Sequence, residues 1–483
     1  MVLGLLVLWL LFGGSRRPAD APPRATLGVP IVGTYIEFAK NPVDFVAQCQ
    51  AKFGPIFTVN MLHKKLTFLI GPEVSAPFFR QNDDVMSQPE VYGFMTPVFG
   101  KGVVYDAEPK RRYHQTSSMS RALLKSANLE AYVPKIEAET LDYLRARWGN
   151  EGKVDILEAL SELTILTSSR CLHGDDVRES LGAEVARLYH DLDKGVTPLS
   201  FFFPYAPTEA HACRDKARGE MVAIFSKVID ERRKKGANES ATDILQTFID
   251  LKYNESSPGA GDGRQLTNDE VVGLLIALLF AGQHTSSITS TWTSMFLLHN
   301  AECRAKVEAE QRAILGEANA ASKLTFADVG KMEYLQNCVK ESLRLHPPLI
   351  LLMRMAMQDV KTKLGDQEFT IPKGDIVLTS PAVASRLASV FTNPNSFDPD
   401  RFAEPRKEDK VPFSFLGFGG GMHQCLGQTF GLLQVKTIVS VLFRNYELEA
   451  LSSELPDPDY TAMVVGPKNR CEVRYKRRPQ SAI

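Results

Sequence analysis

The chain has 483 residues, of which 44% are apolar and 23% charged, as in a globular protein large enough to bury an extensive core. Its formal net charge of -1 gives no bulk electrostatic attraction to nucleic acid, and no zinc-finger or Walker spacing occurs, so we exclude a nucleic-acid partner. The seven cysteines are scattered, odd in number and without a CxxC pair, which argues against a disulfide framework and for a reducing compartment.

The N-terminus is a separate apolar piece. Residues 1–14 are almost wholly apolar and uncharged, and Arg16 and Arg17 follow before a proline-rich stretch. The apolar run is shorter than the ~20 residues that span a bilayer core, and one alternative is a secretory signal peptide, although no basic residue precedes the run. We favour the interpretation that residues 1–14 form a membrane anchor. Residues 15–29 then form a stiff hinge, and residues 30–483 form a single folded domain.

Two regions of the chain predict β-structure. Short β-rich runs occur between residues 30 and 80, for example at 56–59 and 66–70. A strand pair is expected within 362–377, with a turn near Gly374. The remainder of the chain is expected to contain little sheet.

Helical patterns dominate from about Ala127 onward, and the polar, Gly-rich segment 237–268 is expected to be a surface loop. The longest predicted helix covers 269–298 and begins at the capping box of residues 267–270. Such a length predicts a helix that crosses the core. The fold class is therefore mainly α with a small β region (α+β), in one domain built around a long central helix.

Cys425 differs from the other cysteines in its surroundings. It lies in the glycine-rich run 418–427, and an apolar run at helical spacing, Leu426 to Leu442, follows it. Glycines allow backbone to approach a flat ligand closely, and the amides at a helix N-terminus lower the pKa of a nearby thiol. A buried structural cysteine is the alternative. The combination favours a thiolate bound to haem iron.

Residues 418–427 resemble the haem-binding pattern of the cytochrome P-450 superfamily: Phe, two residues, Gly, one residue, Arg or His, one residue, Cys, one residue, Gly. The resemblance implies a haem cofactor with Cys425 as its axial thiolate and only metal ligand from the chain, which favours O–O cleavage. It also implies haem-loop roles for Gly419 and Gly427. The domain over 30–483 is then a haem-thiolate monooxygenase domain.

The middle of the central helix, Ala281 to Ser287, contains a glycine and a run of hydroxyl residues, which are poor choices for a buried helix. It resembles the oxygen-binding helix of sterol 14α-demethylases, which have histidine where the superfamily usually has an acid. The resemblance implies that Thr285 binds dioxygen or its water and that His284 delivers protons. The alternatives are a kink with back-bonded hydroxyls and a solvated surface histidine.

The run from Tyr92 to Asp106 resembles the substrate loop of the same family. The resemblance implies that Tyr92 and Tyr105 bind the haem propionates, whereas ordinary core packing is the alternative for the aromatic residues of this run. Further implied propionate ligands are Arg354 and His423. The residues implied to line the sterol cavity are Phe94, Phe99, Phe280, Ala281, Leu351, Met353 and Met463.

Glu341 and Arg344 are three residues apart on a predicted helix and can pair on one face. A second arginine, Arg401, follows in the run 397–402. The resemblance implies that these three residues form a buried charged triad with a structural role in supporting the haem loop. Removing one partner of a buried ion pair costs ~3–5 kcal/mol.

The resemblance implies a sterol 14α-demethylase, which removes the sterol 14α-methyl group as formate in three successive oxygenations. The chain has no GxGxxG fingerprint, so electrons from NADPH must arrive through a separate cytochrome reductase. The family also implies an endoplasmic reticulum membrane location with the catalytic domain facing the cytosol, contact with membrane lipid, and binding of azole inhibitors.

Phe94 stands where family members with a plant-like preference have phenylalanine, which predicts obtusifoliol-type 4α-monomethyl sterols over lanosterol. A methylene-sized difference gives only ~10–200-fold discrimination. Two other functions remain open: a haem-thiolate monooxygenase acting on a fatty acid or xenobiotic, and a non-catalytic haem carrier or gas sensor.

Overall fold

The computed structural model of the chain describes residues 17–27, 32–61, 64–235, 243–253, 263–316, 322–479 and 481. The predicted membrane anchor, 1–14, and both ends of the predicted hinge lie outside these residues. The chain divides into two compact units. Unit 1 consists of Met1–Tyr92, Arg344–Ser396 and Arg401–Cys425, and unit 2 of Gly93–Leu343, Phe397–Asp400 and Leu426–Ile483.

Unit 1 is built on a five-stranded sheet with the strand order β1-β2-β8-β5-β3. The antiparallel β1–β2 hairpin confirms the β-rich runs predicted before residue 80. β2 pairs in parallel with β8, and β5 pairs antiparallel with β8, which places Arg354 opposite Val377. The strands are β1 (Ile56–Met61), β2 (Lys64–Leu69), β3 (Met86–Ser87), β5 (Leu352–Ala356) and β8 (Ile376–Thr379).

The second predicted strand pair is also present in unit 1. β6 (Val360–Leu364) and β7 (Gln367–Ile371) pair antiparallel and are joined at Gly365, whose φ of 56° is left-handed. The turn predicted near Gly374 joins β7 to β8 instead of closing this pair.

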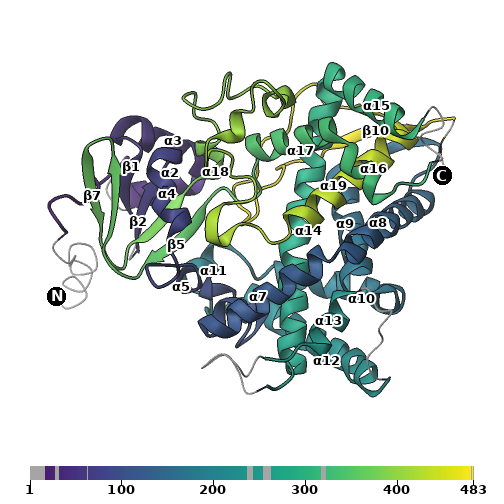
Figure 1. Ribbon diagram of the computed structural model, residues 1–483, viewed down its shortest axis with the longest axis horizontal. Helices are drawn as coiled ribbons and strands as arrows, with labels where there is room; N and C mark the ends of the chain where they lie inside the picture. The colour runs from purple at the N-terminus through teal and green to yellow at the C-terminus, as the bar shows by residue number, and fades with distance from the viewer. Residues whose placement is uncertain are drawn as a thin grey trace. The chain divides into compact units, whose positions relative to one another are not determined.

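Helix α4 covers the core of unit 1. Its Val74, Phe78 and Phe79 are buried with residues from the strands, including Leu69 and Val377. Figure 1 shows the short helices of this unit close to its strands. The helices are α2 (Val32–Lys40), α3 (Pro42–Phe53), α4 (Pro72–Arg80), α5 (Pro89–Tyr92) and α18 (Pro381–Ala384).

Unit 2 is mostly helical and surrounds the long helix α14 (Asn268–His299), which packs against α9, α12 and α19 (Figure 1). A small antiparallel sheet of β4 (Glu151–Asp155), β10 (Glu472–Arg477) and β9 (Tyr446–Ala450) accompanies the helices. The other helices are α6 (Thr96–Phe99), α7 (Pro109–Leu124), α8 (Ser126–Arg147), α9 (Ile156–Leu172), α10 (Asp175–Asp193), α11 (Pro198–Phe202), α12 (Glu209–Lys235), α13 (Ile244–Asp250), α15 (Ala301–Leu315), α16 (Phe326–Lys331), α17 (Glu333–Leu345, ending in unit 1) and α19 (Gln428–Asn445).

The predicted central helix is confirmed within one residue at each end. Thr267 is its N-cap: its hydroxyl accepts from the Glu270 N–H at 3.2 Å, and the Glu270 carboxylate accepts from the Thr267 N–H at 2.8 Å. Among the described residues, α14 alone is long and apolar enough to cross a membrane, but most of it is buried in the protein as a core helix.

The predicted surface loop 237–268 was partly wrong. Within it, Ile244–Asp250 forms α13, capped by Asp243, whose carboxylate accepts from the Gln246 N–H at 2.8 Å. Ile244 and Phe248 are buried, so a short apolar face gives this helix its place in the core. Residues 237–242 and 254–262 of the predicted loop lie outside the described residues.

Candidate functional site

In unit 1, residues 418–425 form a loop that ends at Cys425, which we call the cysteine loop. Its thiol is exposed, and its backbone N–H donates to the Phe418 carbonyl at 2.9 Å, which fixes the end of the loop. The loop turns at Gly421, where φ is 63° and a Cβ would overlap the Phe79 carbonyl oxygen. Phe79 also stacks on Phe413 at 4.6 Å. Helix α4 is thus a rigid backing for the loop, and only glycine fits at 421.

Other cysteines of the chain have surroundings that oppose thiolate formation. Cys49, Cys171 and Cys471 are buried, and burial raises the pKa of each to about 12. Burial also raises the pKa of Cys338 well above its usual value. Thiols of this kind stay protonated at neutral pH, whereas a metal-binding cysteine must be a thiolate. Cys425 differs from these four because it is exposed, which suits a cysteine that binds iron.

Two side chains in unit 1, Arg354 and His423, have nitrogen atoms that suit the carboxylates of a haem. Arg354, on β5, is only 2% exposed; it donates to the Gln81 carbonyl at 2.9 Å and lies over the Phe78 ring at 4.8 Å. Burial lowers the pKa of Arg354 to about 10, so the guanidinium is still charged at neutral pH. The Nε2 atom of His423 lies 3.1 Å from the Asp83 carboxylate. Sequence reasoning missed Asp83 because its partner is far away in the chain.

The predicted oxygen-binding segment is a partly exposed stretch of an otherwise buried helix. We call this stretch, Ala281–Thr285, the opening of α14. α14 is buried throughout Glu270–Phe280 and again from Ser286 to Leu297, yet Ala281 is exposed and Thr285 is partly exposed. The predicted alternative of back-bonded hydroxyls is also present, since Thr285 donates to the Ala281 carbonyl at 2.6 Å. Back-bonding satisfies the hydroxyl proton while its oxygen lone pairs remain available.

His284 is not a solvated surface histidine. Its Nε2 atom lies 3.2 Å from the Asp193 carboxylate at the end of α10, with the imidazole 24% and the carboxylate 36% exposed. Its ring is also 6.0 Å from the Phe280 ring in an edge-to-face arrangement. A carboxylate that is partly open to solvent and bound to a histidine can exchange protons with water. Asp193 is 91 positions before His284, and no sequence pattern joined them.

Three aromatic residues that were predicted to line the sterol cavity lie in unit 2. We call Phe94, Phe99 and Phe280 the aromatic wall. Phe99 lies 6.1 Å from Phe280 edge to face and 6.1 Å from the Tyr105 ring. Phe94 packs edge to face on Phe201 at 5.7 Å. We did not predict Phe201, although the run of three phenylalanines at 201–203 was a signal for it.

Tyr105 follows a strained turn that polar contacts hold in place. Val104 has a φ of 45°, which is costly for a β-branched residue, ~1–3 kcal/mol. Gln115, completely buried on α7, accepts from the Val104 N–H at 2.9 Å and donates to the Gly102 carbonyl at 2.9 Å. Burial raises the pKa of Tyr105 to about 12, so it remains a phenol that can donate to a carboxylate.

The same network reaches the start of the central helix. Gln115 donates to the Tyr253 hydroxyl at 3.0 Å, and Tyr253 donates to Glu270 at 3.0 Å. Arg264 binds Glu270 at 2.7 and 2.8 Å. Burial alone would raise the pKa of Glu270, but hydrogen bonds from Arg264 and the Thr267 N–H lower it to about 2. The turn at Val104, in the run predicted to be the substrate loop, is thus tied to the N-terminus of α14.

The three residues of the predicted charged triad are fully buried. Glu341 accepts from the Asp398 N–H at 2.9 Å, and Arg344 donates to carbonyls of unit 1, including Ser385 at 2.9 Å. Arg401 forms an ion pair with Glu408 at 2.6 Å, a carboxylate that we did not predict. These contacts hold the chain that precedes the cysteine loop.

The remaining predicted residues lie at the ends of their elements. Leu351 and Met353 are partly buried at the start of β5, and Met463 is partly buried in a loop of unit 2. Gly419 has a φ of 67°, and Gly427 is the N-cap of α19.

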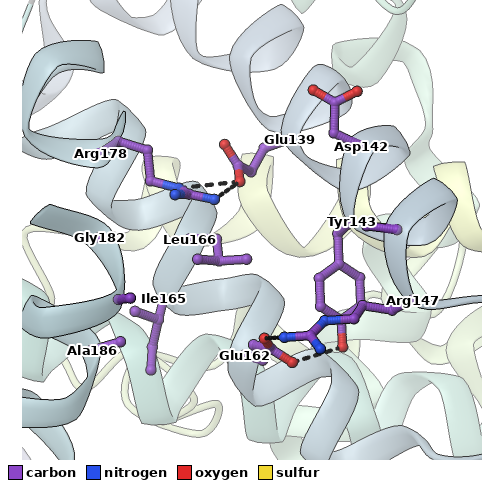
Figure 2. Close-up of a pocket in the computed structure, with 12 residues that line it drawn as sticks. Glu139, Asp142, Tyr143, Arg147, Glu162, Ile165, Leu166, Arg178, Gly182 and Ala186 are labelled. Carbon is purple, nitrogen blue, oxygen red and sulfur yellow. Dashed lines mark hydrogen bonds and ion pairs between the residues drawn. The ribbon is translucent and has the colours of Figure 1, made fainter. Parts of the chain in front are cut away.

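A cavity of about 560 Å³ lies elsewhere in unit 2, among α8, α9 and α10. Figure 2 shows that its charged groups face one another: Glu139 binds Arg178, and Glu162 binds Arg147 and Tyr143. None of the predicted site residues lines this cavity. It is therefore separate from the candidate site.

Comparison with known proteins decides the family. The family model of cytochrome P450 matches residues 22–474. The chain belongs to the cytochrome P450 family. As a cytochrome P450 it is a monooxygenase with haem as its cofactor, as predicted from the cysteine loop, and its mainly α fold with a small β region is confirmed.

Two relatives of this cytochrome P450 cover almost its whole length. Sterol 14-demethylase of Arabidopsis thaliana is 46% identical over 98% of this chain and 95% of the relative. Obtusifoliol 14-alpha demethylase of Triticum aestivum is 48% identical over 95% of this chain and 98% of the relative. The solved structure of retinoic acid-bound cyanobacterial CYP120A1 is 22% identical, with a TM-score of 0.80 over 96% of this chain and all of that chain, and supports the fold.

Proposed function

We propose that this cytochrome P450 is a sterol 14α-demethylase. The observation that carries the proposal is the opening of α14 at Ala281–Thr285, where His284 stands in place of the usual acid and its Nε2 atom lies 3.2 Å from the Asp193 carboxylate. Relatives that are named sterol 14-demethylase and obtusifoliol 14-alpha demethylase and that match nearly the full length support it.

The reaction removes one carbon in three oxygenations. Each takes one dioxygen, two electrons from NADPH and two protons, and releases water; the methyl group passes through alcohol and aldehyde, leaves as formate, and a 14,15 double bond remains. Haem bound through the Cys425 thiolate supplies the oxygen activation. We propose that Tyr92, Tyr105, Arg354 and His423 bind its propionates, and that Gly419 and Gly427 shape the loop.

The chain's own part in each oxygenation is the supply of protons at α14. Asp193 exchanges protons with solvent because its carboxylate is partly exposed, and His284 accepts them at Nε2, 3.2 Å away. The Thr285 hydroxyl, held by the Ala281 carbonyl, presents its oxygen at the helix opening.

The aromatic wall of Phe94, Phe99 and Phe280, with the exposed Ala281, offers an apolar surface suited to a sterol. We propose that Leu351, Met353 and Met463 complete the lining. A bulky ring at Phe94 would crowd a second C4 methyl group. We therefore propose that obtusifoliol-type 4α-monomethyl sterols are preferred over lanosterol.

The partners and location follow from the same proposal. A separate NADPH-dependent cytochrome reductase supplies the electrons, and azole inhibitors bind. We further propose that residues 30–483 act as one catalytic domain at the cytosolic face of the endoplasmic reticulum, held by the anchor at 1–14 against membrane lipid. The Glu341, Arg344 and Arg401 triad has a structural role in this proposal.

The test is turnover by the full chain reconstituted with a cytochrome reductase and NADPH. Obtusifoliol and lanosterol are supplied in parallel, and mass spectrometry measures the 14-demethylated product. We expect product from both and a higher kcat/KM for obtusifoliol. No product from either sterol, from protein whose carbon monoxide spectrum shows the thiolate ligand, would overturn the proposal and favour a monooxygenase of other lipids.

A further inference from the structure

In unit 1, one short turn contacts two of the side chains that we propose bind the haem propionates, Arg354 and His423. The turn lies between α4 and β3. Arg354, from β5, donates to the Gln81 carbonyl at 2.9 Å, and His423, from the cysteine loop, lies 3.1 Å from the Asp83 carboxylate. Arg354 and His423 are 69 positions apart in sequence, yet both contact residues 81–83.

Asp83 is itself held in one position. Its Oδ1 atom accepts from the Gln88 N–H at 2.9 Å, and the turn is closed by the Met86 N–H, which donates to the Asn82 carbonyl at 2.8 Å. The side chains of Asp83 and His423 are 20% and 19% exposed. A carboxylate fixed by its own turn and largely shielded from water can define the position of the ring that it binds.

The contact also determines which ring nitrogen is left for another partner. Nε2 of His423 faces Asp83, so Nδ1, on the other side of the ring, is the nitrogen that remains. A carboxylate bound to one nitrogen fixes the orientation of an imidazole, as in the carboxylate–histidine pairs that support metal ligands. Asp83 also affects Arg354: burial lowers the pKa of Arg354, and the negative charge of Asp83 opposes that change.

We propose that Asp83 is a positioning residue for haem, which orients His423 toward a propionate. This inference rests on the propionate role proposed above for His423. It requires no contact between Asp83 and haem. It adds a carboxylate outside the cysteine loop to the residues that determine how firmly haem is held.

The test is the rate of haem loss from the ferric full-length protein to excess apomyoglobin, followed by absorbance. Asp83→Asn is compared with Asp84→Asn, which makes the same charge change at the neighbouring, exposed position. We expect Asp83→Asn to lose haem about tenfold faster, the effect of one charge-assisted hydrogen bond, and Asp84→Asn to match the unaltered protein. Equal rates for the two variants would overturn the proposal.

A double-mutant cycle separates positioning from a general effect on the fold. His423→Ala should lose haem at least as fast as Asp83→Asn, and the double variant should be no faster than His423→Ala, because Asp83 acts through His423. Rates that multiply would contradict the proposal. An unaltered rate in His423→Ala would overturn it even if Asp83→Asn failed to fold.

The assay uses neither sterol nor reductase. If the variants lost haem as expected but the unaltered protein made no 14-demethylated sterol, the inference about Asp83 would stand and the proposed function would be wrong. Demethylation with no effect of Asp83→Asn would give the opposite result.

Discussion

The two units of the molecule present their functional residues by different physical means. In unit 1, shape decides: the cysteine loop reaches its place because Gly421 lies directly against the Phe79 backbone, where no side chain fits. In unit 2, polar pairing decides: the Nε2 atom of His284 lies 3.2 Å from the Asp193 carboxylate at the opening in α14, and Gln115 holds the turn at Val104. The turn at Gly421 should therefore respond most to added volume, and the opening of α14 most to altered charge.

The largest expected effect tests the packing of unit 1. Gly421→Ala would require both a left-handed alanine and a shift of the Phe79 backbone, which together cost on the order of several kcal/mol. We expect little protein with a thiolate-type carbon monoxide spectrum and a lower unfolding temperature. The control is Gly330→Ala on α16, where a Cβ meets nothing within 4 Å. A Gly421→Ala protein as stable as this control would show that shape does not determine the loop.

The next effect tests polar pairing in unit 2. His284→Ala removes the proton path from Asp193, and we expect sterol turnover to fall by about 10²-fold or more while the haem spectrum is kept. Asp193→Asn should also lower sterol turnover. The control is His190→Ala, an exposed histidine on the same helix as Asp193. Unchanged kcat in both His284→Ala and Asp193→Asn would show that Asp193 and His284 do not deliver protons during turnover.

A third prediction uses pH to test the network at the start of α14. The pKa of Glu270 is lowered from 4.5 to about 2, so its contribution to stability is complete above pH 4.5 and is lost as pH falls toward 2. We expect Glu270→Gln to lose this part of the pH dependence of the unfolding free energy, as measured by denaturant titration.

The matched control for this network is Glu302→Gln. Glu302 forms an exposed ion pair with Lys306 at 3.1 Å, and such pairs contribute about 0.5 kcal/mol or less. Equal pH dependence in the two variants would mean that the contacts of Glu270 do not stabilise the fold.

The smallest expected effect concerns sterol choice. Phe94→Leu replaces the ring that packs on Phe201, and we expect kcat/KM for lanosterol relative to obtusifoliol to rise about tenfold. Competition between the two sterols in one reaction measures this ratio directly. Phe203→Leu, at a half-exposed phenylalanine of the same run, should leave the ratio unchanged. A ratio that is the same in both variants would assign the preference to other residues.

Local patterns predicted the parts of the structure that depend on neighbouring residues. The capping box of Thr267 and Glu270 located the start of α14, and the β-branched runs located β1 and β2. Helix α13 was missed because its apolar face is short and lies within a polar segment. Local propensity is a weak guide to such a helix, since tertiary burial stabilises it.

Long-range partners could not be predicted from one sequence. Asp193 and Asp83 each lie beside a residue that was predicted, but nothing in the chain near them indicates the pairing. A carboxylate on a helix or in a turn is usually a solvated surface group, and only the fold distinguishes these two. The chemistry was therefore predictable from motifs, whereas the groups that position it were not.

The most direct measurement of the central claim is the amount of formate released per dioxygen consumed during turnover of obtusifoliol. The proposed reaction predicts one formate for every three molecules of dioxygen in a tightly coupled system, with a 14,15-unsaturated sterol as the product. Steady consumption of dioxygen with a hydroxylated sterol as the final product and no formate would contradict the assignment as a sterol 14α-demethylase.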